Sequence, residues 1–325
     1  MSRPAPLVSI VTPSYNQGEY LEATIRSVLE QDYPAIEYIV MDGGSTDGSV
    51  EIIQRYADRL AYWVSQPDAG QAAAINNGLA RATGDIVCWI NSDDLLLPGG
   101  LAAVAALHAQ QPRAVLLGNV LHFIPAEGIA YVVRQHNVTL ANQVAEWHTG
   151  WAWNQPGTFM PRAAWEQVGL LDESLRYSFD RDWMCRLLRA GWPLAYVNTT
   201  VAAFRRHAES KTMKEATLWA AERLDVTRRY AQAVPGLAAG EIESAYAVRD
   251  ATIRLSFLHH GSWDAAEARG HLRRALRRRP SLLVSPNYWQ LWLRAALPAP
   301  VVRALRRAWA GRRRAASVPF PKFTA

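Results

Sequence analysis

The sequence predicts an α/β fold, in which a mostly parallel sheet is flanked by helices and is followed by an α-helical C-terminal extension. Over the first hundred residues, short β-branched runs alternate with longer amphipathic runs, which is typical of strands joined by crossover helices. Each strand-like run ends in polar, turn-forming residues. From about residue 215 the chain is rich in Ala, Leu and Arg and contains no strand-like run. We therefore expect a main domain over residues 1–214 and a helical, basic extension over residues 215–325.

The elements of the main domain follow from this alternation, taken in chain order. The pattern predicts strands over residues 7–12, 36–41, 60–64 and 85–90, and helices over residues 19–31, 49–56 and 72–81. Beyond Pro98 the pattern is mixed, with helices expected over residues 102–108, 162–168 and 182–190 and strands over residues 114–118 and 129–133. In an open parallel sheet, ligands bind outside the carboxyl ends of the strands. We therefore expect the four polar loops to line one edge of the sheet.

Composition and charge limit the class of protein. The chain has 325 residues, of which 50% are apolar and 20% charged, so it can bury a core and is not disordered. Its two cysteines cannot form a disulfide-rich scaffold and indicate a reducing compartment. We find no signal-peptide pattern and no apolar run long enough to span a membrane. The sequence thus predicts a cytoplasmic protein.

The charge is divided unevenly along the chain. All 29 acidic residues lie at or before Glu267, whereas 14 of the 35 basic residues lie after it, so the last 57 residues carry +14 and the rest about −8. A basic tail that contains tryptophans suits an anionic surface, so peripheral attachment to the inner face of the membrane is one interpretation. A solvated helical extension or a protein-docking segment is the other. No recognised nucleic-acid motif accompanies the tail, and we expect no nucleic-acid partner.

Two polar loops carry the strongest chemical signal. Residues 91–94 (Asn-Ser-Asp-Asp) directly follow an apolar strand, and their carboxylates suit Mg²⁺ or Mn²⁺ bound to substrate phosphates. The alternative is an acidic turn that caps the next helix. In residues 42–48 (Asp-Gly-Gly-Ser-Thr-Asp-Gly), Asp47 suits a helix cap, whereas Asp42 can accept a hydrogen bond from a nucleobase ring N–H. Neither the dinucleotide-binding nor the P-loop glycine pattern occurs in the right context, which argues against redox and P-loop chemistry.

These loops carry a resemblance to a known family. Residues 8–16, 42–48, 76–78 and 84–94, with Gly70, together resemble the family 2 glycosyltransferases of the GT-A, Rossmann-like fold. The resemblance covers residues 7–100 and extends more loosely to about residue 210. It implies an inverting transfer of a sugar from a nucleotide-diphosphate donor, with Mg²⁺ or Mn²⁺ on the diphosphate. It also implies a glycan or lipid-linked acceptor, in bacterial surface polysaccharide or glycolipid synthesis.

The resemblance assigns residues to the donor side of the site. Thr12, Pro13 and Tyr15 match the nucleobase loop, and Asp42 matches a base-contacting carboxylate. Asp93 and Asp94 match the ribose- and metal-binding pair. The chain departs from the family pattern in three places, which are Asn91 in place of a first Asp, Gly43 in place of a common second Asp, and Gln71 in place of a phosphate-contacting basic residue of some relatives. We therefore expect Asp94 as the main metal ligand and Asp93 as the secondary one.

The acceptor side is less well marked. Residues 179–183 resemble the family's acceptor motif, with Phe179 in place of its Glu, which implies that Asp180 is the catalytic base. The alternative is that Asp180 caps a helix and that Asp182 pairs with Arg186. Residues 204–207 resemble a late Arg/His segment, so His207 is a candidate for a further metal ligand or phosphate contact. Trp147, Trp151 and Trp153, with the amides of residues 154 and 155, suit either a sugar site or core packing.

Two other classes of function compete with the transferase. A sugar-phosphate nucleotidylyltransferase would share the sheet and the metal, but it requires a basic, glycine-rich loop after the first strand, which residues 13–18 do not supply. A non-catalytic sugar- or nucleotide-binding protein would not need Asp180. The acidic residues at the strand ends favour the transferase.

Overall fold

The computed structural model describes residues 5–149, 153–207, 209–255 and 263–302, which form two compact units. Unit 1 contains the described parts of Met1–Thr139 and Trp151–Arg206, and unit 2 contains those of Leu140–Gly150 and His207–Ser317. The division at residue 206 lies before the predicted boundary at residue 214. Unit 2 also takes in an earlier segment, which the sequence did not indicate. The last 23 residues of the basic tail lie outside the described residues, as does Trp151.

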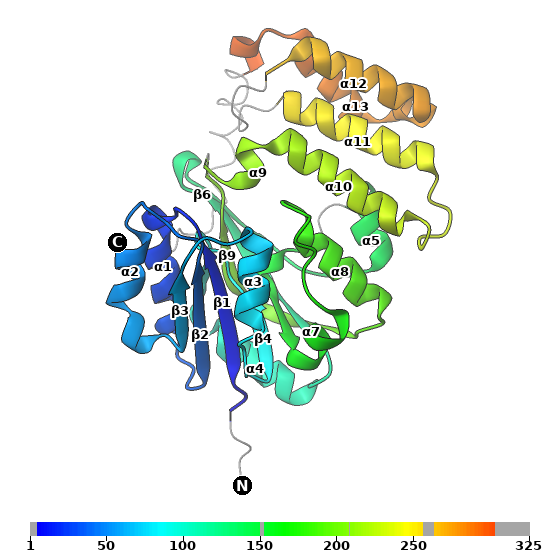
Figure 1. Ribbon diagram of the computed structural model, residues 1–325. Helices are drawn as coiled ribbons and strands as arrows, with labels where there is room; N and C mark the ends of the chain where they lie inside the picture. Colours follow the sequence, from blue (N-terminus) through cyan, green and yellow to red (C-terminus); the bar gives the residue numbers. More distant parts are fainter. Residues whose placement is uncertain (1–4, 150–152, 208, 256–262, 303–325) are drawn as a thin grey trace. The chain divides into compact units, whose positions relative to one another are not determined.

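Unit 1 is built on a mixed sheet with the strand order β3-β2-β1-β4-β8-β6-β9-β5, and β7 pairs with β6 (Figure 1). The first half is parallel and consists of β1 (Val8–Ser14), β2 (Ile36–Asp42), β3 (Tyr62–Ser65) and β4 (Ile86–Trp89). The second half consists of β5 (Leu95–Leu96), β6 (Val115–Ile124), β7 (Ile129–Val133), β8 (Thr158–Pro161) and β9 (Leu194–Arg205). The predicted α/β class is confirmed, and β8 and β9 are the main strands that the sequence did not predict.

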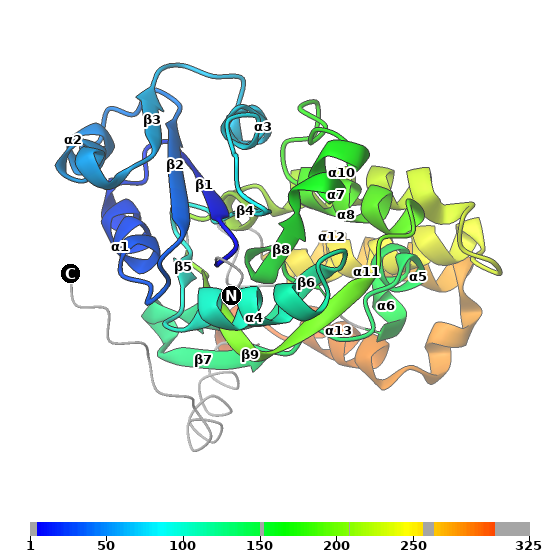
Figure 2. The same ribbon diagram turned by 90° about the horizontal axis from the view of Figure 1, so that it is seen from below.

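Helices cover both faces of this sheet (Figure 2). On one face α1 (Gly18–Leu29), α2 (Ser49–Arg55) and α4 (Gly100–Gln110) bury Leu21, Ile53 and Val104 against alternate residues of the strands, such as Ile10 and Val40. This alternation is the period-two pattern of a strand that faces helices on both sides. On the other face lie α3 (Gln71–Leu79), α7 (Arg162–Val168) and α8 (Phe179–Arg189).

A close approach fixes α3 on its face of the sheet. A Cβ added to Gly78 would lie 2.5 Å from the Val11 side chain of β1, so a larger residue cannot be accommodated there without a shift. Several short helices complete unit 1, namely η1 (Ala57–Arg59), η2 (Pro125–Glu127) and η3 (Gln155–Gly157). The predicted bounds of β7 and α7 coincide with those in the structure, whereas β1 continues two residues beyond its predicted end at Thr12.

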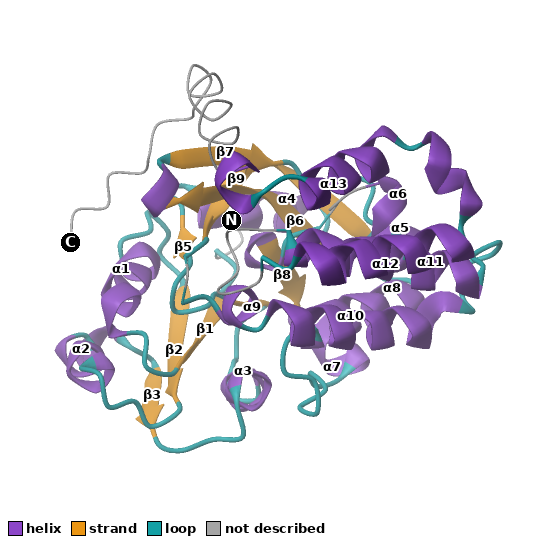
Figure 3. Cartoon of the chain, turned by 90° about the horizontal axis from the view of Figure 1, so that it is seen from above, coloured by secondary structure: helices purple, strands orange, loops and turns teal. Residues whose placement is uncertain are grey.

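The described part of unit 2 is wholly helical (Figure 3). It consists of α5 (Leu140–Val144), α6 (Glu146–Thr149), α9 (Lys211–Lys214), α10 (Ala216–Ala231), α11 (Ala239–Arg254), α12 (Ala265–Arg278), η4 (Pro280–Val284) and α13 (Pro286–Ala296). The buried carboxylate of Glu146 pairs with Arg223 of α10 and Arg249 of α11, which joins α6 to both long helices. Leu272, Tyr288 and neighbouring apolar side chains form a separate core between α11, α12 and α13. No helix among the described residues is long and apolar enough to cross a membrane.

Candidate active site

The polar loops of unit 1 meet at one edge of the sheet. The parallel register pairs Ser14 with Asp42 and Asp42 with Ser65, so β1, β2 and β3 end at the same level. The pairing of β1 with β4 brings the loop after Trp89 to the same edge. The arrangement predicted from the sequence is therefore confirmed, and the four loops form one rim.

Asp94 lies in the loop after β4 at this rim, and its side chain points into the protein. Its side chain is fully buried, Oδ1 accepts a hydrogen bond from the backbone N–H of Arg205 (3.0 Å), and Oδ2 accepts one from the Asn91 amide (3.1 Å). Thr24 of α1 donates to the backbone carbonyls of Ser92 and Asp94, at 2.8 Å each. Both α1 and β9 therefore hold the loop after β4 in place.

The surroundings of Asp94 disfavour the charged form of its carboxylate. Burial, and then the negative charge of Asp93, raises the pKa of Asp94 well above its ordinary value, and the hydrogen bond from the Arg205 N–H counters part of that shift. The Arg205 side chain supplies the nearby positive charge. Its Nε donates to the backbone carbonyl of Asp93 (2.9 Å), and its guanidinium lies between the rings of Tyr20 and Phe123, 5.0 and 4.9 Å from their centroids. The strand residue Arg205 thus stabilises the acidic pair.

Asp93 differs from Asp94 in its exposure. Its side chain is half-buried, whereas Asp94 is 0% exposed. Asn91, which replaces the family's first Asp, accepts a hydrogen bond from Nε2 of Gln71 (2.8 Å) and donates to Asp94. Gln71 is the first residue of α3, so it links the loop after β3 to the loop after β4. Here the Gln71 side chain positions the acidic loop.

The loop after β2 is organised by Asp42. This carboxylate is 2% exposed and accepts hydrogen bonds from the backbone N–H groups of Gly44 and Ser45 and from the hydroxyls of Ser45 and Ser65, at 2.5–3.1 Å. Asp47 accepts hydrogen bonds from the backbone N–H groups of Gly18 (2.8 Å) and Ser49 (3.1 Å). Both carboxylates therefore hold loops together.

The three residues that the resemblance assigns to the nucleobase loop differ in their exposure. Thr12 and Pro13 are buried within β1, and the Thr12 hydroxyl lies 3.0 Å from the hydroxyl of Tyr38 in the interior. Tyr15, directly after the strand, is 63% exposed. Of these three residues, Tyr15 is the one whose side chain is available to a ligand at the rim.

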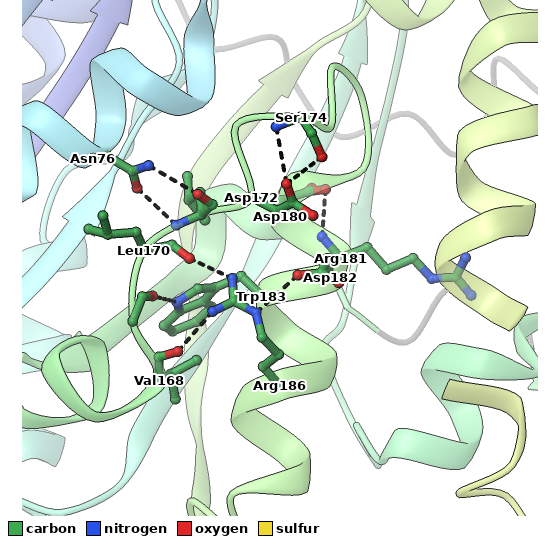
Figure 4. A network of polar contacts seen from close by, with 12 residues as sticks. Asn76, Val168, Leu170, Asp172, Ser174, Asp180, Arg181, Asp182, Trp183 and Arg186 are labelled. Carbon is green, nitrogen blue, oxygen red and sulfur yellow. Dashed lines mark hydrogen bonds and ion pairs between the residues drawn. The ribbon is translucent and has the colours of Figure 1, made fainter. Parts of the chain in front are cut away.

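Asp180 lies in the first turn of α8, with Ser178 at the N-cap position (Figure 4). Its side chain is half-buried, and Oδ1 accepts the backbone N–H of Arg181 (2.7 Å). One turn further along, the Trp183 ring packs edge-on against Trp89, the last residue of β4, with centroids 6.2 Å apart. This contact anchors the start of α8 on the strand that carries the acidic loop.

The loop before α8 is clamped from both sides (Figure 4). Arg186 pairs with the buried Asp182 (2.9 Å), as one of the sequence alternatives stated, and donates to the backbone carbonyls of Val168 and Leu170. Asn76 of α3 exchanges two hydrogen bonds with the backbone of Leu171, at 2.9 and 3.1 Å. The sequence did not predict that Asn76 holds this loop, although residues 76–78 (Asn-Asn-Gly) belong to the segments that resemble the family. These contacts give Asp180 a rigid support.

Trp153 and the two residues that follow it pack inside unit 1. Trp153 is 9% exposed and its indole N–H donates to Thr158, while the buried amides of Asn154 and Gln155 bond to His122 and to the carbonyl of Trp89. For these three residues the structure supports the alternative of core packing, because their side chains are buried. Trp147 belongs to unit 2, where its indole N–H donates to Glu241 (3.2 Å).

The rim can offer a metal ion few protein ligands. Among the described residues, no group of three or more His, Cys, Asp and Glu side chains gathers into a metal-binding cluster. A half-buried aspartate at the rim fits the usual mode of Mg²⁺ or Mn²⁺, which bind one or two carboxylates, waters and substrate phosphates. His207 is the first residue of unit 2, where its backbone bonds to Ser210, and its assignment as a metal ligand stays a prediction.

Comparison with known proteins defines the class of this domain. Residues 9–170 match the model of glycosyl transferase family 2, and the chain belongs to that family. The Bacillus subtilis protein TuaG, whose name assigns it provisionally to teichuronic acid biosynthesis as a glycosyltransferase, is 44% identical over 92 residues, covering 27% of this chain and 36% of TuaG. The chain spans 36–59% of the length of the first curated relatives that it matches.

Two solved structures show the same fold. Staphylococcus aureus TarS 1–349 in complex with UDP-GlcNAc has a TM-score of 0.53 at 18% identity, covering 89% of this chain and 79% of the other. The mannosyltransferase PcManGT of Pyrobaculum calidifontis, in complex with GDP-Man and Mn²⁺, has a TM-score of 0.52 at 20% identity, covering 94% and 80%. The predicted GT-A fold is thereby confirmed.

Replacing Asp94 tests its structural role. We expect Asp94→Ala to lower the free energy of unfolding by about 1–3 kcal/mol, because the N–H of Arg205 and the amide of Asn91 lose their buried acceptor. Urea denaturation followed by circular dichroism measures this. The matched control is Asp58→Ala, which removes an exposed carboxylate of η1 and should change stability by less than about 0.5 kcal/mol. Equal stability of the two variants would contradict this role.

Proposed function

We propose that the chain transfers a sugar, with inversion at the anomeric carbon, from a nucleotide-diphosphate donor to a hydroxyl of a glycan or lipid-linked acceptor. One observation carries this proposal. The buried Asp94 and the Arg205 charge fix the acidic loop at the carboxyl edge of four parallel strands and leave Asp93 half-exposed there. A carboxylate held rigidly at such an edge suits a donor diphosphate and its metal ion.

We assign the metal ligand from the exposure of the two aspartates of the acidic loop. This assignment reverses the order predicted from the sequence, in which Asp94 is the main ligand and Asp93 the secondary one. Both oxygens of Asp94 accept hydrogen bonds from protein donors, so a cation bound there would compete with the Arg205 N–H at Oδ1 or with the Asn91 amide at Oδ2. Asp93 is half-buried and lies one residue earlier in the same loop. We therefore assign Asp93 as the main protein ligand of Mg²⁺ or Mn²⁺, and Asp94 as the residue that positions it.

The transfer step needs one further group, a base for the acceptor hydroxyl. In our proposal Asp180 accepts that proton while the acceptor oxygen bonds to the anomeric carbon and the bond from that carbon to the diphosphate breaks. The nucleoside diphosphate leaves on the opposite side, which inverts the configuration. A bound divalent ion supplies charge stabilisation for the leaving diphosphate. The clamped start of α8 supports the role of Asp180, because a base must be held in one orientation.

The acceptor class rests on the relatives. TuaG is named for teichuronic acid biosynthesis, and TarS was solved with UDP-GlcNAc. These names support a role in the synthesis of a bacterial surface polysaccharide or glycolipid. A UDP- or GDP-linked donor is supported by the complexes of TarS with UDP-GlcNAc and of PcManGT with GDP-Man.

Asp93→Ala should abolish most metal-dependent donor turnover. We expect kcat/KM to fall by about a hundredfold or more, because several kcal/mol of charge stabilisation are lost with the metal ligand. Release of nucleoside diphosphate from a panel of nucleotide sugars, with Mn²⁺ or with EDTA, measures this. The free energy of unfolding in urea should fall less than in Asp94→Ala, because the Asp93 side chain is half-buried whereas that of Asp94 is fully buried. Full Mn²⁺-dependent turnover by Asp93→Ala would refute the metal assignment.

Asp180→Asn separates catalysis from binding. The amide keeps the size of the side chain but cannot accept the acceptor proton, so we expect kcat to fall by about 10²–10⁴-fold while donor binding stays within about twofold. Initial rates of transfer and calorimetric titration with the nucleoside diphosphate give the two quantities. Transfer at the wild-type rate would remove Asp180 from the mechanism.

We also propose that unit 2 attaches to an anionic membrane surface. Four exposed apolar side chains, Leu283, Val284, Trp289 and Leu293, belong to η4 and α13, and we call them the η4–α13 surface. The indole N–H of Trp289 donates to the carbonyl of Leu283 (2.7 Å), which holds η4 against α13. Residues 268–302 contain seven arginines and no acidic residue. Apolar side chains beside a stretch of net positive charge suit a membrane containing acidic lipids.

Liposome sedimentation tests this surface. The double variant Val284→Asp with Leu293→Asp should bind vesicles of phosphatidylglycerol and phosphatidylcholine at least about tenfold more weakly than the unmodified chain, because two inserting side chains are lost. Leu218→Asp, at an exposed apolar position of α10, is the matched control and should bind as the unmodified chain does. Binding to pure phosphatidylcholine should be weak for all three. Unchanged sedimentation of the double variant would rule out the η4–α13 surface as the contact.

A further inference from the structure

A groove lies along the outermost strand of the parallel half of the sheet. The helix α3 is seated over β1 and β2, because a Cβ added to Gly78 would lie 2.5 Å from Val11 of β1 and 3.1 Å from Met41 of β2. The strand β3 stands at the end of the sheet order, beyond β2, and all four of its residues are only half-buried. The position of α3 thus leaves one face of β3 partly open. A cavity of about 350 Å³ lies there, and we call it the α3–β3 groove.

The apolar part of the lining comes from three side chains. Met41 and Val64 are direct partners in the register of β2 and β3, and Ala80 directly follows α3. Apolar side chains of this kind suit the C–H groups of a small ligand. The volume lies at the lower end of the range for small-molecule sites, about 300–1,000 Å³. The α3–β3 groove therefore has the size of a site for a small organic ligand.

The polar part of the lining has unused capacity. Gln66, Asn77 and Arg81 are exposed, and in the described part of the chain none of their side chains forms a hydrogen bond or an ion pair. Their backbones are nevertheless fixed. The N–H of Gln66 donates to the carbonyl of Asp42, and that of Arg81 donates to the carbonyl of Gly78, at 3.0 Å each. Two amides and one guanidinium are thus available to a ligand in the groove.

The guanidinium of Arg81 is held against an aromatic ring. Its Cζ atom lies over the ring of Tyr62, 4.2 Å from the centroid. A guanidinium that contacts a ring through its face keeps its N–H edge free, and that edge matches two oxygens of a carboxylate or a phosphate. Among the described residues that line the groove, Arg81 is the only charged one. The groove therefore favours an anionic group at this end.

We propose that the α3–β3 groove binds a sugar that carries a carboxylate or a phosphate group. Arg81 binds the anionic group, and the amides of Gln66 and Asn77 bind hydroxyls, because each amide offers two donors and an acceptor. The groove extends from Gln66, just after the carboxyl end of β3, to Tyr62 and Arg81 at its amino end, away from the rim. Its ligand is a unit of an acidic glycan acceptor or product, and this last clause rests on the proposed function.

A titration followed by nuclear magnetic resonance, with the ¹⁵N-labelled full chain and without nucleotide or metal ion, tests this inference. The probes are D-glucuronate, glucose 6-phosphate, D-glucose and inorganic phosphate. We expect one or both acidic sugars to shift the side-chain amide signals of Gln66 and Asn77, which Gln66→Ala and Asn77→Ala identify. The Kd should be at least about tenfold lower than for glucose or inorganic phosphate, the value of one hydrogen bond to a charged group. The two acidic sugars distinguish a carboxylate site from a phosphate site.

A charge-removing variant and a matched control sharpen the test. Arg81→Gln should bind the acidic sugars at least about tenfold more weakly. Arg113→Gln, at an exposed arginine directly before β6 and remote from β3 in the sheet order, should bind them as the unmodified chain does.

Three results would overturn the inference. These are the absence of shifts at the two amides with both acidic sugars, equally tight binding by Arg81→Gln, and equally tight binding of glucose or inorganic phosphate by the unmodified chain. The transferase proposal stands in each case, because the titration contains no nucleotide. That proposal fails separately, if no nucleotide sugar is turned over.

Discussion

The candidate site depends on one buried interaction, the hydrogen bond from the Arg205 backbone to the carboxylate of Asp94. It joins the end of β9 to the loop after β4, although the two residues are 111 positions apart in the chain. Burying a carboxylate is costly, and the raised pKa of Asp94 reflects that cost. The hydrogen bonds from the Arg205 N–H and the Asn91 amide, and the nearby guanidinium of Arg205, offset part of it. This contact keeps Asp94 buried, whereas the neighbouring Asp93 in the same loop is half-buried.

The acidic residues of the rim and of the start of α8 thus divide into two groups by what surrounds them. The buried group, Asp42, Asp94 and Asp182, accepts several hydrogen bonds or an ion pair and holds loops and the start of α8 together. The half-buried or exposed group consists of Asp68, Asp93 and Asp180, which lie on the loops and on the helix that these contacts hold in place. Small residues complete the arrangement, since Gly43 and Gly78 allow loop and helix to come close to the strands. Rigid supports of this kind are what a site for group transfer requires.

The sequence predicted the first half of the fold well because its strands and helices have clear periods. It missed β9, whose burial stops alternating after its first five residues and whose pairing with β6 shifts register near Asn119. It also missed β8, which has four residues and ends at a proline. The motifs identified the family and the residues that gather at the rim. They could not tell Asp93 from Asp94, because the difference lies in a backbone group of Arg205. The motifs also could not predict the hydrogen bonds of Gln71 and Asn76, because the partners of these residues are distant in the sequence.

The most direct measurement is a crystal structure of the full chain with bound UDP or GDP and Mn²⁺, with the metal located by its anomalous scattering. Our account predicts that Mn²⁺ lies within bonding distance of an Asp93 carboxylate oxygen and of the diphosphate, and that Asp94 keeps its hydrogen bond to the Arg205 N–H. A metal ion bonded to Asp94, with that hydrogen bond broken, would contradict it.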